Sequence, residues 1–537
     1  MGHSLLFNNF IKPHIDNQDP FLIFRDGSSI SYQDFFSLSK KISQFFVENH
    51  ISKGDRVLFQ LEKSIYGLAV YTACIMTGAI YVPLNDQYTL EETKYFIHDS
   101  EPKFIFCSSY RAKEIQKLKL KEDTSIYEID PIDGFLKFNI DEYKELEDIQ
   151  TVNSDEIISF LYTSGTTGKS KAVALSHNNL YSNASSLKEH WHIQKSDRLI
   201  HMLPIFHTHG LFVAINTAFL SGLSLYFFEK FSLSDLVEVL PKSTLLMGVP
   251  TYYKRMNDSS LINKDLTSKM RLFISGSAPL SSIDHQDFYQ KTGHTILERY
   301  GMTETNMNTS NPYEGERKPG SVGLPLPDVQ IRITEGSSKI PLLAKEIGMI
   351  QVKGPNVFSS YWKNDHANQE SFTDDGFFIT GDLGYIDQDG YVHISGREKD
   401  LIISGGFNIY PKEIEDLINN HPDIKESAVV GIKDDDLGEV PVAVIVVDMD
   451  FKYQVLTDLE NLFQQKLAKF KVPREIKILE ELPRNAMGKI QKNKISRSPA
   501  GTGSGSKCIS RLLDRLATVV ISGCSRLCGR GGIDDFF

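Results

Sequence analysis

The chain has few cysteines and no apolar run long enough to cross a membrane. Five cysteines in 537 residues do not suggest a disulfide framework, so we expect a reducing compartment, the cytoplasm. The most apolar long segment, 66–82, contains polar residues and predicts a buried helix that leads into a strand. The N-terminus has neither the basic start nor the cleavage site of a signal peptide.

The chain also lacks an excess of positive charge. Its net charge of −11 argues against nucleic acid as a partner. A hydrophobic content of 41% and a charged content of 24% are typical of soluble globular proteins. A length of 537 residues exceeds what one hydrophobic core usually holds, so we predict two or more domains. The sequence leaves the oligomeric state open.

Helical and strand patterns alternate along the first 330 residues, which predicts an α/β fold with helical crossovers. An amphipathic helix is expected over 31–49, with Ser31 as its cap, and strands over 56–60 and 103–107. Short strands over 330–352 indicate a small β element, and a further strand is expected over 391–394. A compact α+β pattern follows, with helices over 411–420 and 455–467 and strands over 426–432 and 440–447.

The most informative stretch is Tyr162 to Lys171, which reads Tyr-Thr-Ser-Gly-Thr-Thr-Gly-Lys-Ser-Lys. Glycines, hydroxyls and lysines in this pattern can hold a phosphate with backbone N–H groups and positive charge. A P-loop is the rival interpretation, but Thr163 stands where that motif needs its first glycine. Predicted strands over 157–161 and 171–175 flank the loop, so we favour a hairpin that grips phosphate. The candidate phosphate-binding residues are Thr163, Ser164, Gly165, Thr166, Thr167, Gly168, Lys169 and Lys171.

Two further stretches suggest a ligand pocket. The segment 204–210 carries His207 and His209, which could gate a pocket, be ordinary core histidines, or bind a metal from a strand. No third ligand cluster supports the metal. The strand-like segment 274–279 ends in Ser275, Gly276 and Ser277, whose small side chains would let a flat ring approach the backbone.

Three more stretches carry groups suited to a nucleotide. In the segment 298–305, Tyr300 and Gly301 offer a stacking face, and Glu304 offers the carboxylate that Mg²⁺ prefers beside phosphate. Asp382, between two glycines and upstream of Arg397, suits the hydroxyls of a ribose. Lys489 follows a glycine, and a mobile lysine could neutralise charge that develops during a reaction.

Taken together, these motifs resemble the acyl-activating, AMP-forming enzyme superfamily over residues 20–497. The resemblance implies ATP, Mg²⁺ and coenzyme A as cofactors and co-substrates. It implies a large N-terminal α/β domain (1–398) with parallel-type sheets plus a small β element, and a small mobile C-terminal α+β domain (399–497). The Ser- and Gly-rich tail, 498–537, resembles nothing in the family, and we expect it to be disordered and dispensable.

The resemblance also implies a role for each motif residue. The loop 163–171 would hold the β- and γ-phosphates of ATP. The adenine would contact Gly276, Ser277, Tyr300, Gly301 and Met302, and the ribose would contact Asp382 and Arg397. The catalytic residues would be Thr303, Glu304, His207 and Lys489, with Glu304 as the metal ligand, Lys399 as the hinge, and Gly405 and Gly406 lining the pantetheine tunnel.

Within the superfamily, the segments 207–210 and 299–312 look most like those of malonyl-CoA synthetases. A second carboxylate is costly to bury unpaired, and Arg299 could bind it in a bidentate manner, with Arg255 as a second candidate. A salt bridge from Arg299 to Glu298 or to another surface acid is the alternative. The remaining acid-pocket candidates are His207, Ser275 and Met307. Two other functions stay open: a short-chain or aryl acyl-CoA synthetase, and a module that loads the thiol of a carrier protein.

Overall fold

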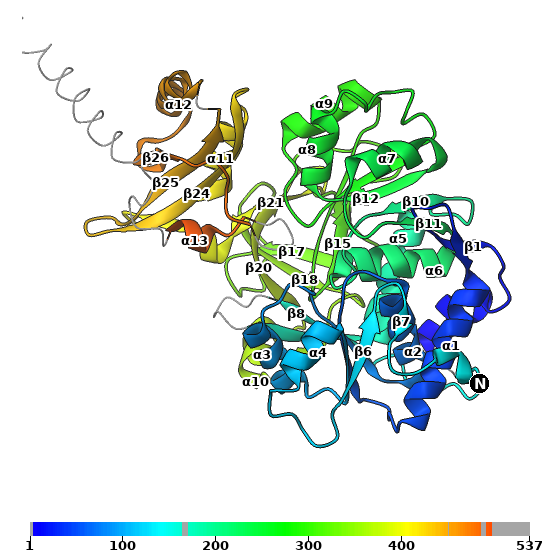
Figure 1. Cartoon of the computed structure of the whole chain (residues 1–537). Coiled ribbons are helices and arrows are strands. Elements are labelled where there is room, and N and C mark those ends of the chain that lie inside the picture. The colour runs from blue at the N-terminus through cyan, green and yellow to red at the C-terminus, as the bar shows by residue number, and fades with distance from the viewer. Residues whose placement is uncertain (1–3, 164–169, 449, 485–489, 497–537) are drawn as a thin grey trace, which may run out of the picture. The chain divides into compact units, whose positions relative to one another are not determined.

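A computed structural model describes residues 4–163, 170–448, 450–484 and 490–496 (Figure 1). The chain divides into two compact units, Met1–Leu401 and Ile402–Phe537, and each is described by itself. The sequence-based boundary lies after residue 398. In the described residues, no helix is both long and apolar enough to cross a membrane.

An eight-stranded sheet organises the first part of the first unit, and its central strands are parallel. Helix α1 (Tyr32–Glu48) precedes its strands in the sequence, and α2 (Ile65–Thr77), α3 (Leu90–Ser100) and α4 (Ser109–Ile115) lie between them. The predicted cap of α1 is confirmed, because the side chain of Ser31 accepts a hydrogen bond from the N–H of Asp34. The strands are β3 (Arg56–Gln60), β4 (Ile80–Pro83), β5 (Phe104–Cys107), β6 (Ser125–Asp130), β7 (Gly134–Phe135), β8 (Ile157–Thr163), β9 (Lys171–Ser176) and β19 (Ser360–Tyr361).

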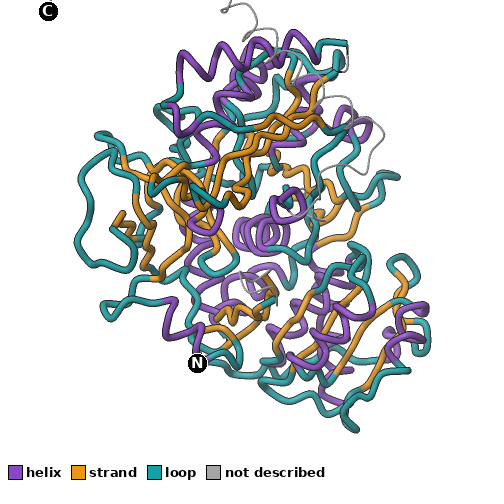
Figure 2. The backbone as a smooth tube through the Cα atoms, turned by 90° about the vertical axis from the view of Figure 1, so that its left-hand side faces the viewer, coloured by secondary structure: helices purple, strands orange, loops and turns teal. Residues whose placement is uncertain are grey.

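A nine-stranded sheet follows, and its parallel strands are buried almost throughout, as expected for a sheet covered on both faces. Helices pack beside the strands of these sheets (Figures 1 and 2). The helices are α5 (His177–His190), η4 (His209–Ile215), α6 (Asn216–Ser221), α7 (Leu233–Val239), α8 (Pro250–Asp258) and α9 (Ser282–Thr292). The strands are β1 (Pro20–Ile23), β2 (Ser29–Ser31), β10 (Arg198–His201), β11 (Ser224–Phe227), β12 (Leu245–Gly248), β13 (Leu272–Ser275), β14 (Leu297–Met302), β15 (Asn306–Ser310) and β16 (Leu324–Pro325).

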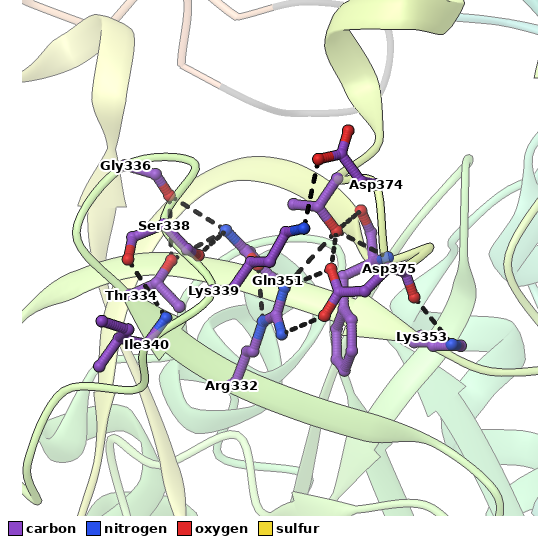
Figure 3. A network of polar contacts seen from close by, with 12 residues as sticks. Arg332, Thr334, Gly336, Ser338, Lys339, Ile340, Gln351, Lys353, Asp374 and Asp375 are labelled. Atoms are coloured by element: carbon purple, nitrogen blue, oxygen red, sulfur yellow. Dashed lines mark hydrogen bonds and ion pairs between the residues drawn. The ribbon is translucent and has the colours of Figure 1, made fainter.

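The small β element is a four-stranded antiparallel sheet of β17 (Gln330–Thr334), β18 (Gly348–Lys353), β20 (Phe378–Ile386) and β21 (Val392–Arg397). The strand expected over 391–394 continues to Arg397, because β21 keeps pairing with β20 as far as the register pair Asp382↔Arg397. Figure 3 shows the polar network beside this sheet, in which Arg332 binds the carboxylate of Asp375 at 2.7 and 3.0 Å. The amide of Gln351 completes the network with a 2.9 Å bond to Thr334.

The second unit has its own core, formed between a sheet and the helices packed on it. The predicted helices and strands of this α+β unit are confirmed, with ends that shift by a few residues. Its strands are β22 (Ile402–Ser404), β23 (Phe407–Ile409), β24 (Ile424–Asp434), β25 (Gly438–Val447) and β26 (Glu475–Ile478). Its helices are α11 (Pro411–Asn419), α12 (Lys452–Lys466) and α13 (Lys492–Ser496). The predicted fold class, mixed α/β with parallel-containing sheets and a smaller α+β unit, is therefore confirmed.

Candidate active site

The candidate site of the first unit lies where β14 leaves the parallel sheet. Strand β14 pairs in parallel with β13 up to the register pair Ser275↔Glu298, and from Arg299 onward it pairs antiparallel with β15. Ligands in open α/β sheets bind outside the carboxyl ends of the strands. The change of pairing therefore brings predicted residues from β13, β14 and β15 to such an end, among them Ser275, Arg299 and Met307.

Arg299 is a buried guanidinium without enough partners. Arg299 as a whole is only 4% exposed, and the Nε and Nη2 atoms of its side chain have no hydrogen-bond partner. Because these two nitrogen atoms are unpaired, Arg299 does not form a bidentate salt bridge with Glu298. Burial lowers the pKa of Arg299 to about 9. An unpaired buried charge is costly, and an anion bound here would relieve that cost.

Gly276 leaves the room that the guanidinium needs. A Cβ atom at residue 276 would lie 2.3 Å from Cζ of Arg299, closer than non-bonded atoms can approach. The backbone of Gly276 is not in the left-handed region, so space rather than φ explains the glycine here. The predicted small residue after β13 thus lies against the arginine side chain.

His209 adds a neutral imidazole to the cluster around Arg299. It is buried, its Nε2 has no partner, and its Nδ1 lies 3.4 Å from Oγ of Ser277. Burial lowers the pKa of His209, and the positive charge of Arg299 lowers it further. The hydroxyls of Thr208 and Ser275 are also buried without a partner.

The histidines do not form a strand-borne metal site. His209 opens the helical segment η4, and the half-buried His207 precedes it, with Nδ1 3.5 Å from the N–H of His209. The described residues contain no group of three or more His, Cys, Asp or Glu side chains that could hold a metal ion. The helical position of His209 therefore does not fit the alternative of metal ligands carried by a strand.

A second cluster joins three of the predicted nucleotide residues. The hydroxyl of Tyr300 donates to Oδ2 of Asp382 at 2.6 Å, and Nε of Arg397 lies 3.0 Å from Oδ1. Asp382 is 3% exposed, whereas the side chain of Arg397 is 44% exposed. The charge of Asp382 is the main cause that raises the pKa of Arg397. A carboxylate in this position, next to an accessible guanidinium, can accept hydrogen bonds from ribose hydroxyls.

Glu304 is held by a residue that the sequence analysis missed. The hydroxyl of Tyr361 donates to Oε1 of Glu304 at 3.0 Å, and Nζ of Lys171 lies 4.8 Å from the centre of the Tyr361 ring. Strand β19 places Tyr361 opposite Val173 of β9, so the contact links two distant segments. No local spacing in the sequence signals it. Burial raises the pKa of Glu304, and one such carboxylate fits Mg²⁺ that takes its other ligands from phosphate and water.

The structure describes only part of the predicted phosphate-binding loop, 163–171. Ser164, Gly165, Thr166, Thr167, Gly168 and Lys169 lie outside the described residues, as does Lys489. The flanking strands β8 and β9 form an antiparallel hairpin in which Thr163 faces Lys171. A P-loop would continue into a helix, so this hairpin rules against that alternative.

The other predicted residues divide between the two units. Thr303 and Met302 lie at the β14–β15 turn, and Gly301 packs so closely that a Cβ would lie 1.8 Å from the carbonyl oxygen of Asn306. Lys399 is exposed in the short helix Glu398–Asp400. In the second unit, Gly405 and Gly406 form the turn between β22 and β23.

Arg255, the second candidate partner for a carboxylate, is exposed. Its guanidinium carbon lies 5.5 Å from the centre of the Phe231 ring, and its neighbours include Asp258 on the same helix. Arg299 is the buried arginine of the pair, and it alone has nitrogen atoms buried without partners. The geometry therefore favours Arg299 over Arg255 as an anion site.

Family profiles and solved structures place this chain among known proteins. Residues 14–362 match the AMP-binding enzyme family, and residues 413–489 match the AMP-binding enzyme C-terminal domain. A malonate–CoA ligase of Arabidopsis thaliana is 32% identical, over 89% of this chain and 86% of the relative. A 2-succinylbenzoate–CoA ligase of Bacillus subtilis is also 32% identical, over 89% of this chain and 95% of that protein.

Solved structures similar to this chain belong to CoA ligases as well. The crystal structure of ATP-bound MatB from Rhodopseudomonas palustris is 43% identical, with a TM-score of 0.88, and the match covers 92% of this chain and 98% of that one. The o-succinylbenzoate CoA synthetase of Bacillus subtilis, in complex with ATP and magnesium, is 29% identical with a TM-score of 0.78, covering 90% and 98%. The chain belongs to the AMP-binding enzyme family.

Proposed function

We propose that this protein is an AMP-forming acid–thiol ligase that joins malonate to coenzyme A. The observation that carries the proposal is the buried guanidinium of Arg299, which has two nitrogen atoms without partners. A monocarboxylic acid would leave that charge uncompensated, whereas the distal carboxylate of malonate would accept hydrogen bonds from it. Similarity to malonate–CoA ligases supports the same acid.

The walls of the pocket suit a short dicarboxylate better than a fatty acyl chain. Strand β15 is buried along its whole length, and most of its residues are polar. Asn308 keeps an amide nitrogen without a partner there, and the hydroxyl of Ser275 is also unpaired. A long alkyl chain would bury such groups without hydrogen bonds, which is unfavourable. Methylmalonate would fit only if Met307, which is 2% exposed, left space for the extra methyl group.

The first half-reaction is adenylation. A carboxylate oxygen of the acid attacks the α-phosphorus of ATP, and the bond to the departing pyrophosphate breaks. Asp382 and Arg397 would hold the ribose, Tyr300 the adenine, and the hairpin of β8 and β9 the phosphates. Glu304 would hold Mg²⁺, which neutralises the phosphate charge when bound. Catalysis of this step rests mostly on positioning and charge neutralisation.

The second half-reaction forms the thioester. The thiol sulfur of coenzyme A attacks the acyl carbon of the adenylate, and AMP leaves. Lys489 would act in adenylation, Lys399 would serve as the hinge, and Gly405 and Gly406 would line the path of the pantetheine arm. These assignments come from the motif resemblance described above.

A panel of acids tests the proposal. With ATP, Mg²⁺ and coenzyme A, we expect the highest kcat/KM for malonate, lower values for methylmalonate, and very low values for acetate, benzoate and 2-succinylbenzoate. AMP, pyrophosphate and the thioester should form in equal amounts. Better turnover of acetate or an aromatic acid would contradict malonate. Product on a carrier-protein thiol, with none on coenzyme A, would favour the carrier-loading alternative.

Gly276→Ala provides a test of the arginine pocket. The added methyl group would displace the guanidinium of Arg299, whose flexible side chain can move without unfolding the sheet. We expect KM for malonate to rise about tenfold or more, because a charge-assisted hydrogen bond contributes roughly 1.5–3 kcal/mol. The melting temperature should change little. Gly431→Ala is a matched control in the second unit, since its Cβ would lie 3.1 Å from the end of the Glu439 side chain and 3.3 Å from Cγ1 of Ile402, without touching Arg299.

An unchanged KM for malonate in Gly276→Ala would contradict the placement of the acid beside Arg299. A rise in KM for ATP of the same size would point instead to a general disturbance of the site.

A further inference from the structure

Lys63 is a cation that the reaction outlined above does not use. It follows β3, and its Nζ lies 2.6 Å from Nδ1 of His201, 3.0 Å from the carbonyl oxygen of His201 and 2.6 Å from that of Phe228. The same atom lies 4.3 Å from the centre of the Phe227 ring. The three protons of the ammonium group can therefore each meet an acceptor, and none of these acceptors is a carboxylate.

These contacts determine which nitrogen of His201 carries the proton. His201 ends β10, and it is 1% exposed. Burial lowers the pKa of Lys63. Three acceptor atoms surround its Nζ, however, and only an ammonium group has a proton for each of them. Because an ammonium group can only donate, Nδ1 of His201 accepts from it. Burial lowers the pKa of His201, and Lys63 lowers it further, so the ring is neutral. The single ring proton then lies on Nε2, which is 2.9 Å from the carbonyl oxygen of Gly210 and donates to it.

Gly210 directly follows Thr208 and His209, which belong to the proposed acid site. A Cβ at residue 210 would lie 2.0 Å from the carbonyl oxygen of Pro204, so the chain from 204 to 210 folds back tightly on itself. Thr208 and His209, both buried with unpartnered atoms, lie within this turn. A hydrogen bond to Gly210 therefore acts on the backbone that carries these two side chains.

We propose that Lys63 is a positioning residue of the acid site: it holds His201 in the tautomer whose Nε2–H bonds to Gly210, and so fixes the turn that carries Thr208 and His209. The inference rests on the proposed function only in taking this turn as the wall of the acid pocket. If Lys63 merely filled space at the end of the sheet, its loss would affect stability and leave KM for the acid unchanged.

The test begins with Lys63→Met, which gives an unbranched side chain only one atom shorter and removes the donors. Without Lys63, the ring proton of His201 can move to Nδ1. The unprotonated Nε2 then faces the carbonyl oxygen of Gly210, and the hydrogen bond between them is lost. We expect KM for the acid to rise about tenfold, the usual cost of one buried hydrogen bond, and KM for ATP to stay within about twofold. Lys230→Met is the control, because the Lys230 side chain is 83% exposed beside Glu229.

A second substitution separates the tautomer from charge and packing. The amide nitrogen of Gln can stand in for Nε2 of His and donate without a choice of tautomer. We therefore expect His201→Gln to keep a near-normal KM for the acid, and the double variant Lys63→Met with His201→Gln to recover most of the loss. His201→Leu, which has no donor, should raise KM for the acid about as much as Lys63→Met.

An unchanged acid KM in both Lys63→Met and His201→Leu would overturn the inference, as would a double variant no better than Lys63→Met. If Lys63→Met does not fold, the comparison of KM for the acid between His201→Gln and His201→Leu still tests whether the hydrogen bond to Gly210 positions the acid site. The measurements use the acid with the highest kcat/KM in the panel. A different preferred acid would therefore contradict the malonate proposal without affecting the comparison of KM for the acid with KM for ATP.

Discussion

Replacing Arg299 by alanine is expected to lower kcat/KM for malonate by about a thousandfold, because truncating one partner of a buried charge pair costs roughly 2–5 kcal/mol. The cost falls on the distal carboxylate, which would be buried without a cation. Acetate has no second carboxylate, so its low activity should be unchanged or improved. Steady-state kinetics on both acids, at saturating ATP and coenzyme A, measure the difference.

Two companion variants sharpen that result. Arg255→Ala removes the same charge from an exposed position over Phe231, and we expect its effect on malonate to be less than about threefold, as for surface charges. Arg299→Lys should recover only part of the activity, because an ammonium group cannot form the bidentate contact of a guanidinium. Equal losses on malonate and acetate in Arg299→Ala would show that Arg299 does not recognise the second carboxylate.

Replacing Asp382 by alanine should raise KM for ATP by about a hundredfold, since it removes a buried charged acceptor worth roughly 2–3 kcal/mol for a hydrogen-bonded ribose. The variant also leaves the hydroxyl of Tyr300 and the guanidinium of Arg397 without their shared partner. KM for malonate should change much less, because Arg299 and His209 form a separate cluster. Initial rates over a range of ATP concentrations check this.

Asp375→Ala is the matched control for Asp382→Ala. Asp375 also accepts from an arginine beside the same small sheet, but it lies in the network of Arg332 (Figure 3). Its loss should weaken the packing of Arg332 and leave KM for ATP unchanged. If the two aspartate variants raised KM for ATP equally, the effect would come from the sheet as a whole and not from a ribose contact.

Much of the fold could be predicted because its signals are local. The cap at Ser31 and the strands on either side of 164–169 follow from residues close together in the chain. The end of strand β21 at Arg397 could not be predicted, because it depends on pairing with Asp382, fifteen residues earlier in the chain. Segment 391–394 looks complete by itself, and the charged residues after it suggest a loop.

The residues of the candidate site likewise divide into those that local sequence predicts and those that it does not. Arg299, Tyr300 and Glu304 stand out because they share one short stretch of sequence. Tyr361 and Lys63 do not stand out in the sequence, because each contacts a residue more than fifty positions away. The helical start at His209 was also missed, because two histidines at alternate positions look the same in a strand and in a tight turn.

Exchange of labelled pyrophosphate into ATP, measured without coenzyme A, tests the central claim most directly. The exchange requires an acid to form an adenylate reversibly, so it isolates the first half-reaction. The account predicts exchange that depends on Mg²⁺ and on malonate, with little or none when acetate replaces malonate. Exchange that is equally strong with acetate, or release of phosphate without any acid, would contradict it.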